Sequence, residues 1–126
     1  DLAINLCLPP LAQIDPVIFS VPSGACDCHA HVFGPKKAFP FISDRSYTPP
    51  EAPIAAYQEM HRKLGIARAV IVQPSVYGTD NGATLNAIKQ YGDDNARGIE
   101  VVAKDVSEAE LATLHQRGSR GVRSIH

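Results

Sequence analysis

The 126-residue sequence lacks an apolar run of transmembrane length, an excess of basic charge and an even number of cysteines. A membrane-spanning helix needs about 18 or more consecutive apolar residues, so no membrane-embedded protein is expected. The formal net charge of -1 gives nucleic acid no basic surface to bind. Two of the three cysteines stand in Cys26-Asp27-Cys28, which is typical of free thiols in a reducing compartment and predicts a cytoplasmic protein.

The N-terminal stretch also lacks the basic start and the small-residue cleavage site of a signal peptide. Residues 1–23 contain several prolines and predict an irregular N-terminal arm. Residues 24–126 are expected to form one folded domain. The hydrophobic fraction of 44% and the charged fraction of 20% are those of an ordinary globular protein, which argues against a disordered tail or a coiled coil.

Short apolar runs alternate with helical patterns throughout the predicted domain. The runs predict strands at 25–32, 67–73, 98–103 and 121–125, and the patterns predict helices at about 50–64, 82–91 and 107–117, with loops at 33–50 and 74–81. Ser107 and Glu110 have the spacing of a capping box at the start of the third helix. The resulting order, βαβαβαβ, predicts an α/β fold with parallel strands and crossover helices.

Two α/β architectures have this order: an open doubly wound sheet and a (β/α)8 TIM barrel. The first predicted strand is not followed by G-x-G-x-x-G, which removes the main evidence for a dinucleotide-binding sheet. A complete barrel needs roughly 250 residues, so this chain is expected to supply the N-terminal half of one.

His29 and His31 are the most informative pair of residues. They lie two apart in the first predicted strand, so their side chains are expected to point the same way. Active sites of parallel α/β folds lie at the carboxyl ends of the strands, where this pair falls. Two imidazoles there suit binding of Zn²⁺ or polarisation of a carbonyl, although two histidines alone do not complete a zinc site. The ordinary alternative is two histidines without function at a strand end.

The stretch CDCHAHVFGP at 26–35 resembles the first strand of the amidohydrolase superfamily. It is most similar to the branch that holds 2-pyrone-4,6-dicarboxylate lactonase, 4-sulfomuconolactone hydrolase and galactarolactone isomerase. Further agreeing stretches are RSYTP at 45–49, LGI at 64–66, QPSVYGTDN at 73–81 and RGVR at 120–123. The resemblance implies a TIM-barrel hydrolase that opens a carboxylated lactone, such as 2-pyrone-4,6-dicarboxylate, in aromatic or sugar-acid catabolism.

The resemblance also implies roles for five residues. His29 and His31 match a histidine pair that holds a divalent metal in many relatives and polarises the lactone carbonyl in the metal-free lactonase. Either no cofactor or one divalent metal, such as zinc, is therefore expected. Tyr47, Ser75 and Arg123 match polar groups of the substrate pocket, and a guanidinium binds a carboxylate bidentately. Their ordinary alternatives are packing for Tyr47, a turn hydroxyl for Ser75 and an ion-paired strand end for Arg123.

Other polar residues have simpler interpretations. Asp27 shares the predicted face of His29 but lies deeper in the strand, and we expect it to be a structural hydrogen-bond acceptor. Cys26 and Cys28 alternate with the histidines, which predicts small buried side chains that face the helices. His61 and His115 fall on predicted helices and are expected to be packing or surface groups.

The sequence also departs from the family pattern. The superfamily supplies a further histidine from a middle strand and a final aspartate as general base; neither has a match here, His126 included, and Ser124 replaces an expected aromatic residue. Three explanations would each account for a half barrel: a longer parent protein, a cleavage, or association with a second copy. The alternative functions are a metal-dependent amidohydrolase or decarboxylase of the same superfamily, and an inactive half-barrel that serves as a binding or oligomerising module.

Overall fold

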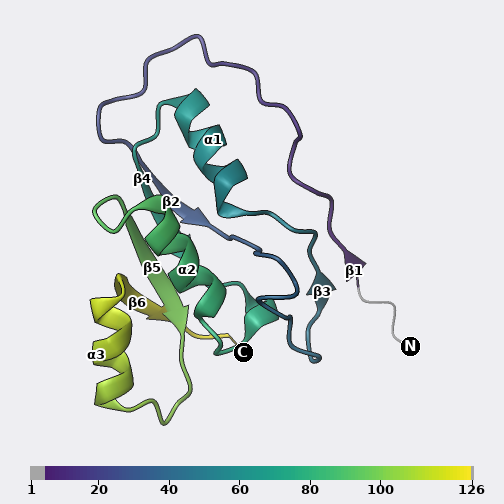
Figure 1. The fold of residues 1–126 in the computed structure, drawn as a ribbon, viewed down its shortest axis with the longest axis vertical. Helices are drawn as coiled ribbons and strands as arrows, with labels where there is room; N and C mark the ends of the chain where they lie inside the picture. The colour runs from purple at the N-terminus through teal and green to yellow at the C-terminus, as the bar shows by residue number, and fades with distance from the viewer. Residues whose placement is uncertain (1–4, 126) are drawn as a thin grey trace.

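Four parallel strands form the centre of the computed structural model, which describes residues 5–125. The strands are β2 (Cys26–Ala30), β4 (Arg68–Val72), β5 (Ala96–Val101) and β6 (Ser119–Arg123), in the spatial order β2-β4-β5-β6 (Figure 1). Each strand pairs in parallel with the next one along the chain. The predicted α/β fold with parallel strands is therefore confirmed.

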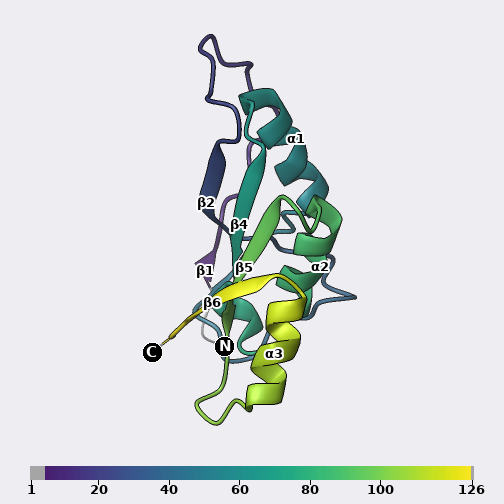
Figure 2. The same cartoon turned by 90° about the vertical axis from the view of Figure 1, so that its left-hand side faces the viewer.

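The connections between these strands carry the helices α1 (Ile54–Leu64), α2 (Gly82–Tyr91) and α3 (Glu108–Gln116). Figure 2 shows that the three helices lie on one face of the sheet. The main core lies between this face and the helices, around Ile71 and Ile88, neither of which is exposed to solvent. No helix in the described part of the chain is long and apolar enough to cross a membrane.

The helix ends follow from local chemistry. Gly65 ends α1 with a φ of 78°, a left-handed conformation that suits glycine, and its N–H bonds to the carbonyl of His61. The predicted capping box at the start of α3 is confirmed: Ser107 accepts from the N–H of Glu110, and the Glu110 side chain accepts from the N–H of Ser107.

Two short strands lie outside the prediction. β1 (Asn5–Leu6), in the N-terminal arm, pairs in parallel with β3 (Tyr47–Thr48), so the arm runs beside the predicted loop 33–50. A 3-10 helix, η1 (Ser75–Tyr77), follows β4 within the predicted loop 74–81. Backbone hydrogen bonds hold β1 and β3 together, and a search for apolar runs does not detect such short strands.

The predicted strand boundaries need correction, most of all in the last two strands. β5 begins at Ala96 rather than at 98, and β6 spans 119–123 rather than 121–125. The ladder sets these limits, because Ala96 pairs with Ala69 and Ser119 pairs with Gly98. Ser119 is therefore part of β6, although this polar residue lies outside the apolar run from which the strand was predicted.

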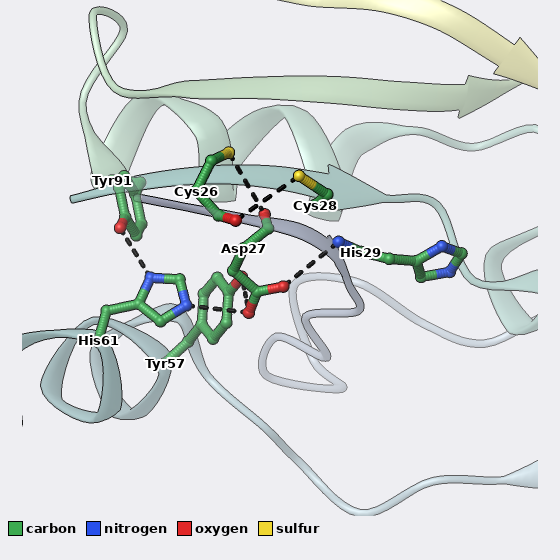
Figure 3. Close-up of polar contacts among 7 residues, drawn as sticks. All are labelled: Cys26, Asp27, Cys28, His29, Tyr57, His61 and Tyr91. Carbon is green, nitrogen blue, oxygen red and sulfur yellow. Dashed lines mark hydrogen bonds and ion pairs between the residues drawn. The ribbon is translucent and has the colours of Figure 1, made fainter. Parts of the chain in front are cut away.

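Strand β2 contains a β-bulge that the sequence did not predict. Asp27 is opposite Ala69 and Ala30 is opposite Ile71, so the two residues between them on β2, Cys28 and His29, oppose a single residue of β4. A bulge interrupts the alternation of side chains along a strand. This interruption allows Asp27 and His29 to point in different directions, as Figure 3 shows. The prediction that these two residues share one face was therefore wrong.

Candidate functional site

The two predicted histidines lie together at the carboxyl end of β2. Their ring centroids are 5.3 Å apart, and the rings meet edge to face at an interplanar angle of 79°. His29 is exposed, whereas His31 is half-buried. The expectation that both imidazoles converge on one small volume agrees with this placement.

His31 has one nitrogen whose role the backbone defines. Its Nδ1 lies 2.8 Å from the carbonyl oxygen of Val72, at the end of β4. A carbonyl only accepts, so Nδ1 carries the hydrogen, and Nε2 of the neutral ring presents a lone pair. Burial lowers the pKa of His31, and the nearby His29 and Arg123 add to this effect against the Val72 hydrogen bond. His31 is therefore favoured as a neutral imidazole with an accepting Nε2.

Ser75 and Arg123 line one cavity of about 570 Å³ beyond the carboxyl ends of β4, β5 and β6. Arg45 and Lys104 line the same cavity, and Asp44 is its only acidic lining residue in the described part of the chain. Three cationic side chains around one cavity favour an anionic ligand.

Arg123 is held by the backbone rather than by an acidic partner. Its Nη1 donates to the carbonyl of Gln73 at 3.1 Å. Within residues 5–125 no carboxylate forms an ion pair with it, so the ordinary alternative of an ion-paired strand end finds no support. The remaining guanidinium donors can serve a ligand carboxylate.

The structure does not bring all five predicted residues into one cavity. His29, His31 and Tyr47 are not among the residues that line the cavity of Ser75 and Arg123. Tyr47 lies on β3 and packs, half-buried, against an apolar cluster that includes Val76 and Tyr77. Its packing is therefore the contact that the structure describes, and a role toward substrate stays a prediction.

Buried amides support the loop after β4, a feature that the sequence reasoning missed. The Gln73 side chain donates to the carbonyls of Gly78 and Asp80 and accepts from the Thr84 hydroxyl at 2.6 Å. Asn81 donates to the carbonyl of Val101 and accepts from its N–H. The available signal was polar residues within the QPSVYGTDN stretch that no apolar pattern explains. These bonds fix the loop that carries Ser75.

A polar network lies behind the histidine strand, between β2 and the helices (Figure 3). Asp27 Oδ2 accepts from the Tyr57 hydroxyl at 2.8 Å and from His61 Nε2 at 3.0 Å. His61 Nδ1 lies 2.7 Å from the Tyr91 hydroxyl. Asp27 is thus a structural acceptor, as predicted. His61, only 1% exposed, packs as expected, but its link to Asp27 was not foreseen.

The expected placement of the two strand cysteines was wrong. Cys26 is half-buried and Cys28 is exposed, and Figure 3 shows both thiols on the side of β2 opposite the Asp27 carboxylate. The carboxylate reaches Tyr57 and His61 of α1, so the thiols face away from that helix rather than toward it. His115, by contrast, is exposed on α3, as expected of a surface group.

A divalent metal would find an incomplete set of donors in this part of the chain. Catalytic zinc sites use about three protein ligands, and His29 and His31 offer two. Residues 5–125 contain no group of three histidine, cysteine or acidic side chains that could hold an ion. His126 lies outside the described residues. These residues do not form a metal site by themselves.

The family follows from a comparison with known sequences: the Amidohydrolase family model matches residues 26–126. This chain belongs to the amidohydrolase family, and the resemblance drawn from its motifs is confirmed. Relatives in this family imply a TIM-barrel fold, in agreement with the parallel α/β arrangement.

Several curated relatives are similar to this chain. It is 47% identical over 105 residues to a 2-pyrone-4,6-dicarboxylate hydrolase of Comamonas testosteroni, with 83% of this chain and 34% of the relative covered. It is 42% identical over 117 residues to a 4-sulfomuconolactone hydrolase of Rhizobium radiobacter, with 93% and 39% covered. The chain thus spans little more than a third of the length of these relatives.

Solved structures give the same picture. A probable 2-pyrone-4,6-dicarboxylic acid hydrolase of Acinetobacter baumannii, crystallised with citric acid, matches with a TM-score of 0.74 and 37% identity over 80% of this chain and 37% of that one. An Agrobacterium tumefaciens protein without ligand matches with a TM-score of 0.73 and 26% identity, covering 80% and 36%.

Proposed function

We propose that this chain is part of a hydrolase that opens a carboxylated lactone, such as 2-pyrone-4,6-dicarboxylate, by attack of water on the ring ester. The observation that carries the proposal is the pairing of His29 with His31 at the same sheet edge that presents Arg123. The similarity to lactone hydrolases of aromatic catabolism supports this choice of substrate.

In the proposed reaction, water adds to the lactone carbonyl carbon, the ring C–O bond breaks, and the ring oxygen takes up a proton. The Val72 hydrogen bond limits the part that His31 can take. Nε2 of its neutral ring accepts a hydrogen from water, whereas only the protonated ring would polarise the carbonyl as a donor. Donation to the carbonyl oxygen therefore falls to His29 in this proposal. The general base that completes the activation of water is placed outside residues 5–125.

Substrate orientation is assigned to the cationic cavity. Arg123 would pair with one carboxylate through its free guanidinium donors, and Ser75 would donate its hydroxyl to the same ligand. Tyr47, on β3, is the third proposed substrate residue. The citric acid bound to the Acinetobacter protein is a carboxylate-rich ligand and is consistent with this choice.

The architecture proposed for this activity is the N-terminal half of a (β/α)8 barrel, preceded by an arm at residues 1–23. Two observations support it: the chain covers about a third of its relatives, and β2 and β6 have one unpaired edge each among the described strands. The unpaired thiols of Cys7, Cys26 and Cys28 support a reducing compartment such as the cytoplasm. A native mass spectrum tests the architecture. A subunit near 13.5 kDa, or a simple multiple, would favour the oligomerising half-barrel instead.

The decisive assay follows hydrolysis through loss of the ultraviolet absorbance of the pyrone ring. The substrate is 2-pyrone-4,6-dicarboxylate, and the matched control is 2-pyrone without carboxylates. We expect turnover of the dicarboxylate and at least tenfold lower kcat/KM for the control, because the control cannot engage Arg123. Equal rates for the two compounds, or turnover of neither by a folded protein, would contradict the proposal.

One observation favours a metal-dependent reaction as the second candidate. A histidine whose Nδ1–H is held by a backbone carbonyl, as that of His31 is by Val72, has the arrangement common among metal ligands. His29 and His31 would then be two of the ligands, and Zn²⁺ would act as a Lewis acid. Activity that disappears after exhaustive chelation and returns with Zn²⁺ would establish this alternative. Activity that survives chelation would exclude it.

A further inference from the structure

The bulge in β2 falls at a residue whose backbone N–H is bonded by a side chain. Cys28 and His29 share one opposing residue of β4, and a bulge residue has no regular ladder partner. The N–H of His29 instead bonds to Asp27 Oδ1 at 3.3 Å. The acceptor of this N–H therefore comes from the side chain two residues earlier.

The Asp27 carboxylate is itself fixed by the helical layer. Its second oxygen, Oδ2, accepts from Tyr57 and His61 of α1, and His61 contacts Tyr91 at the end of α2. Burial on its own would raise the pKa of Asp27, but the hydrogen bonds from His61, Tyr57 and the His29 N–H outweigh it and lower the pKa. The carboxylate is thus ionised and oriented at neutral pH.

The bulge also determines where the imidazoles point. In a regular strand residues 27, 29 and 31 would share one face, and an Asp27 bound to α1 would direct both histidines toward that helix. Figure 3 shows instead that His29 points along the strand end, away from the Asp27 carboxylate. The rings of His29 and His31 contact each other, with centroids 5.3 Å apart, and are not directed toward α1.

We propose that Asp27 is a positioning residue, which holds the β2 bulge through the His29 N–H and thereby keeps His29 and His31 in contact at the sheet edge. Tyr57 and His61 hold the carboxylate in turn, and Tyr91 contacts His61. The inference rests on the proposed lactonase function only for its effect on rate. The arrangement of the two rings is open to a separate measurement.

Two substitutions at Asp27 separate hydrogen bonding from charge. Asp27→Asn keeps an Oδ1 that accepts from the His29 N–H, whereas Asp27→Ala removes the acceptor. NMR on histidine-labelled protein reads the nuclear Overhauser effect between the two rings and the exchange rate of the His29 amide. We expect the ring contact and the wild-type exchange rate of the His29 amide to persist in Asp27→Asn. Both should be lost in Asp27→Ala, with the His29 amide exchanging at least tenfold faster.

The kinetic arm uses a matched control from the same core. Asp27→Ala is expected to lower kcat on 2-pyrone-4,6-dicarboxylate by about 10- to 100-fold, a typical effect of a residue that orients an active-site histidine, with KM within about threefold. Asp27→Asn should keep most of kcat. Ile88→Val, a mild core truncation on α2, should lower the melting temperature without changing kcat.

If Asp27→Ala does not fold, His61→Ala provides the same test one step further from the strand. It removes a donor to Asp27 Oδ2 and leaves Tyr57 in place, so we expect a smaller loss of ring contact and of kcat. An intact ring contact in both alanine variants would overturn the proposal. Equal losses in Asp27→Asn and Asp27→Ala would also overturn it, because the effect would then be one of charge. Absence of lactone hydrolysis in every sample would refute the proposed function alone, and the ring contact would still decide the role of Asp27.

Discussion

Glu100 offers the sharpest prediction about stability, because it is a carboxyl group that is fully buried. It lies on β5 with no exposed surface, and its Oε1 accepts from the Ser119 hydroxyl at 2.7 Å. Its Oε2 is buried without a hydrogen-bond partner among the described residues. Burial raises the pKa of Glu100 to about 7, against the opposing Ser119 bond and the Arg117 charge.

The direction of the pH effect follows from the protonation of Glu100 in the folded and in the unfolded chain. Below about pH 4.5, the ordinary pKa of a glutamate, both the folded and the unfolded chain hold the proton. Between 4.5 and about 7 only the folded chain holds it, so the free energy of unfolding falls as the pH rises. Above 7 both states are ionised and the loss is complete. At roughly 1.4 kcal/mol per pH unit, the full loss is about 3 kcal/mol.

Urea unfolding of the wild type and Glu100→Gln measures this loss directly. Other titrating groups contribute equally to both proteins, so the difference between their unfolding free energies isolates Glu100. We expect that difference to change by about 3 kcal/mol in favour of Glu100→Gln between about pH 4 and pH 9. Ser119→Ala, which removes a donor that lowers the pKa, should move the transition to higher pH. A difference that is constant with pH would refute the reasoning.

Three further predictions concern the site and its support. Arg123→Ala should raise KM for 2-pyrone-4,6-dicarboxylate by about 10- to 100-fold, the effect of a lost charge-assisted hydrogen bond, with little change in kcat; an unchanged KM in steady-state assays would remove Arg123 from the substrate site. On the acid side of the pH profile, kcat/KM should fall below pH 6.5, the ordinary histidine pKa, because activity requires neutral His31 and the pKa of His31 is lowered. A fall that begins above pH 6.5 would contradict the assigned tautomer. Asn81→Ala should reduce the free energy of unfolding by about 2 kcal/mol or more in urea titrations, since both backbone groups of Val101 lose their partner; a change under about 0.5 kcal/mol would mean that water replaces the amide.

The sequence predicts the order of strands and helices because each element has its own hydrophobic period. Strand limits depend on pairing partners that lie far apart in the sequence, and β6 was therefore placed two residues late at 121–125 rather than 119–123. The pairing of β1 with β3 has the same origin. The period of an isolated segment does not contain this information.

The candidate site divides in a similar way. The spacing of His29 and His31 predicted that their side chains lie close together, and family resemblance proposed Arg123 and Ser75 as substrate residues. The bulge could not be predicted, because residue spacing gives side-chain directions only where the strand alternates regularly. The contact between His61 and Asp27, which are 34 residues apart, depends on how α1 packs against β2.

The most direct test of the proposed function is a titration of the protein with 2-pyrone-4,6-dicarboxylate, followed by NMR of labelled histidine and arginine side chains. We predict that the resonances of His29, His31 and Arg123 shift together and saturate with one dissociation constant, while the resonance of exposed His115 stays unchanged. If these three resonances remain still in a folded protein, or shift only with a ligand that lacks carboxylates, the assignment of a carboxylated lactone to this site is contradicted.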